Sequence, residues 1–125
     1  METEVVDKVV LKVPASKEYS GLLRLAVVGI ANRMNFNVDE IDDIKLGVDE
    51  AFTIAVHNAE KREFEITFQL YQDRLEMVVD DLAAVRALEE ELYHEFGFSL
   101  LHSVMDVVEW EKSDSERLRM VKLKK

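Results

Sequence analysis

The sequence predicts an α+β fold, a two-layer α/β sandwich in which helices cover one face of a mostly antiparallel sheet. Three observations predict it: a β-branched stretch near the N-terminus, two following stretches with apolar residues at helical spacing, and two pairs of alternating segments typical of hairpins. The expected order is strand, two helices, two strands, a helical segment and two strands. At this length we expect a single domain over residues 1–125.

The first strand and the first helix are separated by a proline. The strand is predicted over residues 5–13, where β-branched residues dominate, and Pro14 ends it. Ser16 is the expected cap of the helix, with Lys17 and Glu18 in its opening turn. Apolar residues then recur at helical spacing at Leu22, Leu23, Ala26, Val27, Ile30 and Met34.

A second helix is predicted after the break at "NFNVDE". Asn37 or Asp39 is the expected cap, and the helix continues to about Ala59. Its apolar residues form one face: Ile41, Ile44, Val48, Ala51, Phe52 and Ala55.

The remaining strands are predicted as two hairpins. Apolar and polar residues alternate from Glu63 to Leu70 and again after a turn at Gln72 and Asp73. The segment "LAAVRALEEELYHEFGFSLLHSVM" has mostly helical composition, broken near Gly97. "DVVEWEK" and "RLRMVKL" flank a polar turn and predict the closing hairpin, in which Trp110 belongs to the core or the sheet surface.

The composition excludes several functions. The 26 acidic and 16 basic residues give a formal charge of −10, which disfavours binding to nucleic acid and to anionic membranes. The absence of cysteine excludes disulfides, thiolate catalysis and zinc held by cysteine, and the three histidines are too scattered for a metal site. With neither a basic leader nor a long apolar segment, the chain is expected to be cytoplasmic.

Acidic residues are the candidates for chemistry. Glu50 lies on an otherwise apolar helix, where a carboxylate can act as a general base; the alternative is a solvated or ion-paired side chain at the helix edge. Asp80 and Asp81 end a strand, where either could face a ligand. Neighbouring strand residues point to opposite faces, so the two are not expected to form a catalytic pair, and one could instead cap the next helix.

The segment "LKVPASKEYSGLLRLAVVGIANRMNFNVDEIDDIKLGVDEAFTIAVHNA" resembles bacterial anti-sigma factors of the serine-protein kinase type, nearest to the RsbW-like branch. The pieces "VPA..EY.G..RL", "G.A.RM", "DEI.D.K" and "EA.T.AV" agree in order, and "DRLEMVVDD" and "MDVV" extend the likeness. The resemblance implies the ATP-binding fold of histidine kinases and DNA gyrase, with a shortened lid. It also implies two kinds of partner, a sigma factor and an anti-anti-sigma (STAS-type) protein phosphorylated on serine, and a homodimer.

The resemblance implies a nucleotide site whose metal ligand is missing. The family has a glutamate that acts as base and, four residues later, an asparagine that helps to hold Mg²⁺. Glu50 matches the glutamate, but Ile54 replaces the asparagine and offers no oxygen ligand. Asn58 lies one more turn along the helix, about 6 Å away, and is not expected to substitute.

The other two nucleotide boxes also depart from the family. Asp81 matches the adenine-binding aspartate, but Ala83 replaces the glycine that follows it in the family. In the phosphate-binding turn only Gly97 matches, while His94 and Glu95 replace glycines. We therefore expect no cofactor and a vestigial site. The alternatives are a serine-protein kinase with a rearranged site for ATP and Mg²⁺, and a subunit that tunes an intact homologue.

A partner-binding surface is expected on the first helix. Arg24 falls where the family has an arginine that contacts partner proteins, and Glu18 and Tyr19 are expected to share its surface. A guanidinium forms paired hydrogen bonds with a carboxylate, which suits a binding hot spot. The alternative is a solvated arginine on an exposed face.

Overall fold

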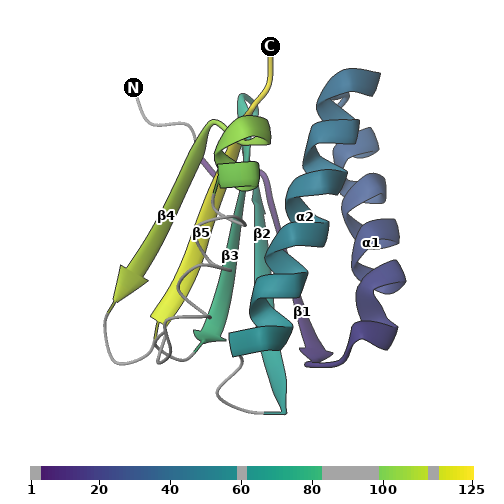
Figure 1. Cartoon of the computed structure of the whole chain (residues 1–125). Helices are drawn as coiled ribbons and strands as arrows, with labels where there is room; N and C mark the ends of the chain where they lie inside the picture. Colours follow the sequence, from purple (N-terminus) through teal and green to yellow (C-terminus); the bar gives the residue numbers. More distant parts are fainter. Residues whose placement is uncertain (1–3, 59–61, 83–98, 113–115) are drawn as a thin grey trace.

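The computed structural model describes residues 4–58, 62–82, 99–112 and 116–125. Five antiparallel strands form one sheet in the order β1-β2-β3-β5-β4, and the helices cover one face of it (Figure 1). The predicted fold class is therefore confirmed. The elements are β1 (Asp7–Pro14), the 3₁₀ turn η1 (Lys17–Tyr19), α1 (Ser20–Arg33), α2 (Val38–Asn58), β2 (Glu63–Leu70), β3 (Arg74–Leu82), β4 (Val107–Lys112) and β5 (Glu116–Leu123).

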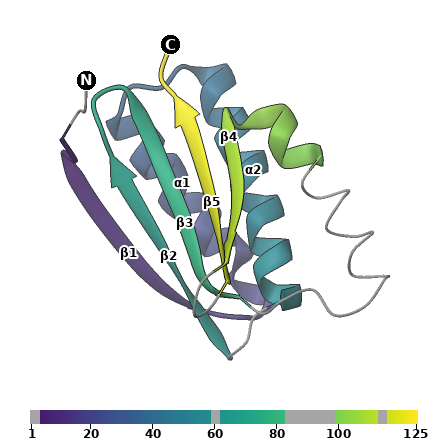
Figure 2. The ribbon, with the colours of Figure 1, turned by 90° about the vertical axis from the view of Figure 1, so that its left-hand side faces the viewer.

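Alternation along the strands produces the two faces of the sheet. Met77 of β3 is paired with Phe68 of β2 and with Met120 of β5, and all three side chains are fully buried under the helices. The residues between them point to the opposite face, which the helices leave uncovered (Figure 2). On that face Arg119 donates to Glu76 at 2.7 Å and to Glu109 at 2.8 Å, so charged side chains from three strands are paired there.

A β-bulge interrupts the alternation at the end of β3. Val79 is paired with Leu118 of β5, but the next paired residue is Leu82, opposite Glu116. The extra residue places Leu82, three positions after Val79, in the core with it. The strict alternation of buried and exposed residues along β3 therefore ends between Val79 and Leu82.

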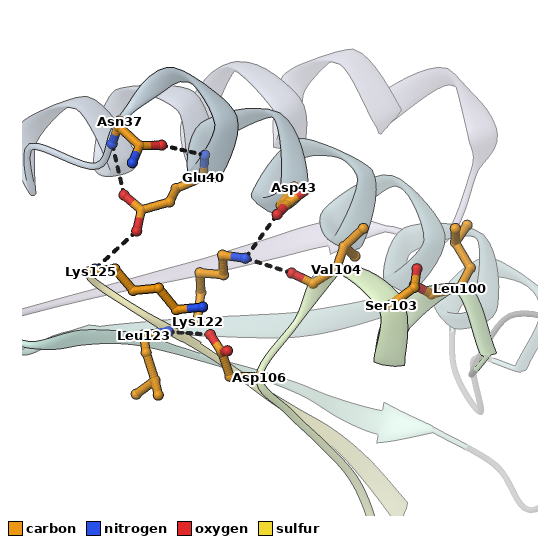
Figure 3. Close-up of polar contacts among 10 residues, drawn as sticks. All are labelled: Asn37, Glu40, Asp43, Leu100, Ser103, Val104, Asp106, Lys122, Leu123 and Lys125. Carbon is orange, nitrogen blue, oxygen red and sulfur yellow. Dashed lines mark hydrogen bonds and ion pairs between the residues drawn. The ribbon is translucent and has the colours of Figure 1, made fainter.

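The start of α2 is fixed by a reciprocal cap. Asn37 Oδ1 accepts from the Glu40 amide at 2.8 Å, and Glu40 Oε1 accepts from the Asn37 amide at 2.9 Å, so Asn37 rather than Asp39 is the cap (Figure 3). Glu40 Oε2 also accepts from the Lys125 amide at 3.0 Å. These backbone hydrogen bonds, that from Asn37 above all, lower the pKa of Glu40 against the opposing effect of its burial. The Glu40 carboxylate thus joins the first turn of α2 to Lys125, which follows β5.

The start of the first helix differs from the prediction. Ser16 precedes the 3₁₀ turn η1 rather than α1, and its hydroxyl donates to Glu18 Oε1 at 3.3 Å instead of capping a backbone amide. Leu22, predicted among the apolar face, is 54% exposed, whereas Leu23 is fully buried. Successive residues are about 100° apart on a helix, so both cannot face the sheet.

A short helix over residues 99–104 packs beside α2 and is held by a buried lysine. Lys122 Nζ donates to the carbonyl of Val104 at 2.8 Å and to Asp43 Oδ2 of α2 at 3.0 Å (Figure 3). A Cβ placed on Gly47 of α2 would lie 3.2 Å from Met105 Sδ, so glycine permits close packing here. No helix in the described parts of the chain is long and apolar enough to cross a membrane.

Candidate functional site

Glu50 lies on α2 as a half-buried carboxylate. Among the described residues its side chain has no hydrogen-bond or ion-pair partner, and burial raises its pKa above the ordinary value. Both features suit a proton acceptor. The same features are expected of a carboxylate beside a site that holds no metal ion. The residues next to Glu50 therefore decide between a general base and a carboxylate without a catalytic role.

Ile54, one turn along α2, has no exposed surface. It belongs to the same core cluster as Phe64 of β2 and Leu82 of β3. The position at which the resemblance implies a magnesium ligand is therefore occupied by an aliphatic side chain inside the core. The described residues here do not fit Mg²⁺, which requires oxygen ligands in near-octahedral geometry. No cluster of three or more potential metal ligands occurs within the described segments.

The other predicted nucleotide positions are not tested. Asp81 belongs to β3, but its side chain lies outside what the structure describes, as do Ala83, His94, Glu95 and Gly97. The adenine-binding and phosphate-binding assignments therefore stay predictions. The neighbouring Asp80 lies 3.6 Å from Arg117 Nε of β5.

A hollow of about 520 Å³ lies between the start of α1 and the end of α2, and we call it the α1–α2 groove. It is lined by Lys17, Ser20, Arg24, Asp49, Phe52, Thr53, Val56 and His57. Inside it Arg24 Nε donates to Asp49 Oδ1 at 3.1 Å and to Oδ2 at 3.3 Å. The two side chains remain 45% and 36% exposed. Arg24 therefore lines the α1–α2 groove as an exposed side chain paired with Asp49.

The remaining predicted partner residues are also accessible. Glu18 is exposed, and Tyr19 is 39% exposed at the start of the same helix. Leu22 and Leu25 of α1 are exposed apolar side chains, at 54% and 75%. Sequence reasoning missed Leu25 and also missed Asp49 as the partner of Arg24. Arg24 and Asp49 are 25 residues apart, so no local sequence pattern indicates their pairing. Leu25 could have been found, because it is an apolar residue outside the predicted apolar face of the first helix.

Comparison with known proteins places this geometry in a family. Residues 13–124 match the family described as histidine kinase-like ATPase domain. The chain belongs to that family. The RsbU and RsbW domains of Rv1364c from Mycobacterium tuberculosis share the fold of this histidine kinase-like ATPase domain, with a TM-score of 0.74 at 10% identity. That likeness covers 96% of this chain and 33% of the other.

Part of the chain is similar in sequence to curated proteins. The domain is 44% identical over 81 residues to the serine-protein kinase RsbW of Bacillus cereus (strain Q1), covering 62% of this chain and 51% of the relative. It is 46% identical over 79 residues to the serine-protein kinase RsbW of Bacillus subtilis (strain 168), covering 60% and 49%. The expected RsbW-like resemblance is confirmed, and the chain spans about half the length of these curated relatives.

Proposed function

We propose that this chain is a cytoplasmic regulatory binding domain that works without nucleotide. It captures a sigma factor, or docks an anti-anti-sigma (STAS-type) protein, without phosphorylating it. The observation that carries the proposal is the complete burial of Ile54 at the position where the family holds Mg²⁺. Without that ligand a triphosphate loses its metal-mediated contacts, which commonly supply several kcal/mol of transition-state stabilisation.

The accessible surface at the start of α1 supports the binding half of the proposal. Glu18, Tyr19 and Arg24 are all accessible, and Leu25 of α1 is 75% exposed. Arginine and tyrosine are among the residues that most often dominate binding energy at interfaces, which favours Arg24 and Tyr19. We also propose that two copies form a homodimer, by analogy with the family.

The test uses the full chain with purified sigma factors and STAS-type proteins from the source organism. Calorimetry with ATP and Mg²⁺ is expected to show no micromolar binding, and the chain is expected to capture a partner equally well with and without ATP. Arg24→Glu is expected to abolish capture. Arg33→Glu is the matched control, because it makes the same charge change on the same helix, at an exposed pair with Asp7. Micromolar ATP affinity, or capture that requires ATP, overturns the proposal.

The second candidate is a serine-protein kinase with a rearranged nucleotide site. Glu50 favours it, because a half-buried carboxylate with a raised pKa and no described partner suits a general base. The similarity to proteins named serine-protein kinase RsbW supports it as well. Transfer of labelled phosphate from ATP to a STAS-type protein, lost in Glu50→Gln, is expected if this candidate holds. Absence of transfer with every purified partner excludes it for those partners.

A further inference from the structure

The α1–α2 groove combines an apolar floor with a cationic rim. Phe52 and Val56 of α2 supply the apolar part, and Lys17 and Arg24 supply two positive charges. Asp49 is the one carboxylate among the described residues of its lining. The Lys, Arg and Asp residues of this described lining sum to a positive charge, in contrast to the formal charge of −10 of the chain. Its complement is a segment that carries an acidic side chain next to an apolar one.

The pairing inside the groove already has the form of such a contact. Arg24 binds both carboxylate oxygens of Asp49 through Nε alone, and its Nη groups have no partner among the described residues. A guanidinium presents five donors and binds carboxylates best in bidentate geometry, so the Arg24–Asp49 pair leaves most of this capacity unused. Both side chains are more than a third exposed, so separating them costs little.

We propose that the α1–α2 groove receives an acidic, apolar segment of the protein partner, and that Asp49 acts as an internal competitor for Arg24. The partner's carboxylate takes the guanidinium through its free Nη donors and displaces Asp49, while the adjacent apolar side chain packs on Phe52 and Val56. This inference rests on the proposed function, because it gives the chemistry of the partner expected there. The binding surface then includes the α1–α2 groove as well as the exposed face of α1, and Asp49 competes with the partner for Arg24.

The test does not need the natural partner. The probe is a helical peptide of about 15 residues, long enough for partial helicity, with leucine and glutamate one turn apart. One control peptide replaces leucine with serine, and another replaces glutamate with lysine. Amide NMR of the full chain is expected to show shifts around Arg24 and from Asp49 to His57 with the leucine–glutamate peptide, and none with either control at the same concentration.

Two pairs of variants test the competition. Asp49→Asn is expected to tighten peptide binding about two- to fivefold, the range for freeing one exposed ion pair. Asp42→Asn, which removes a carboxylate paired with Lys45 elsewhere on α2, is expected to leave affinity unchanged. Arg24→Glu is expected to weaken binding about tenfold or more, and Arg33→Glu is expected to have no such effect.

Several results overturn the inference. Equal shifts with the serine–glutamate peptide mean simple anion binding, and no tightening in Asp49→Asn means that Asp49 does not compete. Groove shifts on concentrating the chain without peptide mean that a second copy is the occupant. If sigma or STAS-type proteins are captured while the peptide does not bind, the groove assignment fails and the proposed function stands. If the peptide binds and no such protein is captured, the proposed function fails instead.

Discussion

At the residue scale, Glu50 and Ile54 lie on the same side of α2 and differ in what surrounds them. Glu50 is half-buried and has no described partner, whereas Ile54 is fully enclosed by core residues. An asparagine at position 54 would bury an amide where the described neighbours in the core are apolar. Ile54, at the position where the resemblance implies a metal ligand, is therefore part of the hydrophobic core.

Ile54→Asn measures how closed this position is. We expect a loss of about 2–4 kcal/mol in the free energy of unfolding, because the change removes core volume and buries an unpaired amide. Ile54→Val, which removes one methyl group, is expected to cost about 0.5–1.5 kcal/mol. Urea unfolding followed by circular dichroism checks both. A nearly neutral Ile54→Asn that gains affinity for Mg²⁺ and ATP would mean that the site is open.

Glu50→Gln tests the burial of the Glu50 carboxylate through pH. Its pKa is raised in the folded state, so the folded chain binds a proton more readily than the unfolded chain. The stability contributed by protonated Glu50 is present below the ordinary value of 4.5 and is lost as pH rises through the folded pKa. At pH 7 the Glu50→Gln variant is therefore expected to be more stable than the parent, by less than about 1 kcal/mol because the carboxylate is only partly buried and solvent screens it.

The measurement for Glu50→Gln is the difference in unfolding free energy from the parent chain at pH 4 and at pH 7. The difference is expected to be larger at pH 7. Glu63→Gln, which removes an exposed carboxylate 3.8 Å from Lys12, is the control for loss of a surface charge. A variant that is less stable than the parent at pH 7 would show that Glu50 makes a favourable interaction.

At the scale of elements, the fold depends on how α2 connects the other parts. Its first turn is tied to the C-terminal strand end through Glu40, its middle packs closely on Met105 at Gly47, and its last turns line the α1–α2 groove. Asp43 brings in Lys122 and, through it, the end of helix 99–104. This one helix therefore sets the relative positions of the groove and of the helix 99–104.

Lys122→Met tests that connection. Lys122 is 8% exposed and its ammonium pairs with Asp43 and with the Val104 carbonyl, so its loss leaves a carbonyl unsatisfied. We expect a cost of about 1–3 kcal/mol and faster hydrogen exchange at the Met105 amide, which closes the last turn of helix 99–104 on Leu101. Lys45→Met, at an exposed pair 3.9 Å long, is expected to change stability by less than about 1 kcal/mol. Equal effects of the two changes would contradict a structural role for Lys122.

The elements themselves were largely predictable, because each depends on a local pattern. Alternation from Glu63 to Leu70 predicted β2, and Asn37, one of the two expected caps, marked the start of α2. The bulge after Val79 was not predictable, because it depends on the pairing of β3 with β5, a strand far along the chain. Of the candidate site, the family pattern located Glu50, Ile54 and Arg24, but the groove itself requires α1 and α2 in contact.

At the scale of the whole molecule, charge is the dominant property. The chain carries 26 acidic and 16 basic residues, and the described ion pairs are mostly exposed, such as Arg33 with Asp7 and Lys12 with Glu63. Exposed pairs contribute little individually, whereas unbalanced negative charge opposes the compact state. The α1–α2 groove differs from this acidic background, because Lys17 and Arg24 in its lining attract carboxylates.

Salt dependence of stability tests this balance. Raising NaCl from about 0.01 M to about 0.15 M shortens the screening length from about 30 Å to about 8 Å, which weakens repulsion more than close pairing. We expect the thermal midpoint, measured by circular dichroism, to rise by a few degrees at pH 7. Near pH 4.7, the isoelectric point, the same change is expected to have little effect. A fall at pH 7 would mean that the ion pairs outweigh the repulsion.

The position of Trp110 has a practical consequence. It is the single tryptophan of the sequence, it lies on the edge strand β4, and its indole N–H donates to the Glu116 carboxylate on β5 while the ring packs on the core. A half-buried indole next to a carboxylate changes its emission when the edge of the sheet separates. The chain therefore carries a built-in fluorophore that reports the opening of one hairpin, and it needs no label to follow β4 as a partner binds.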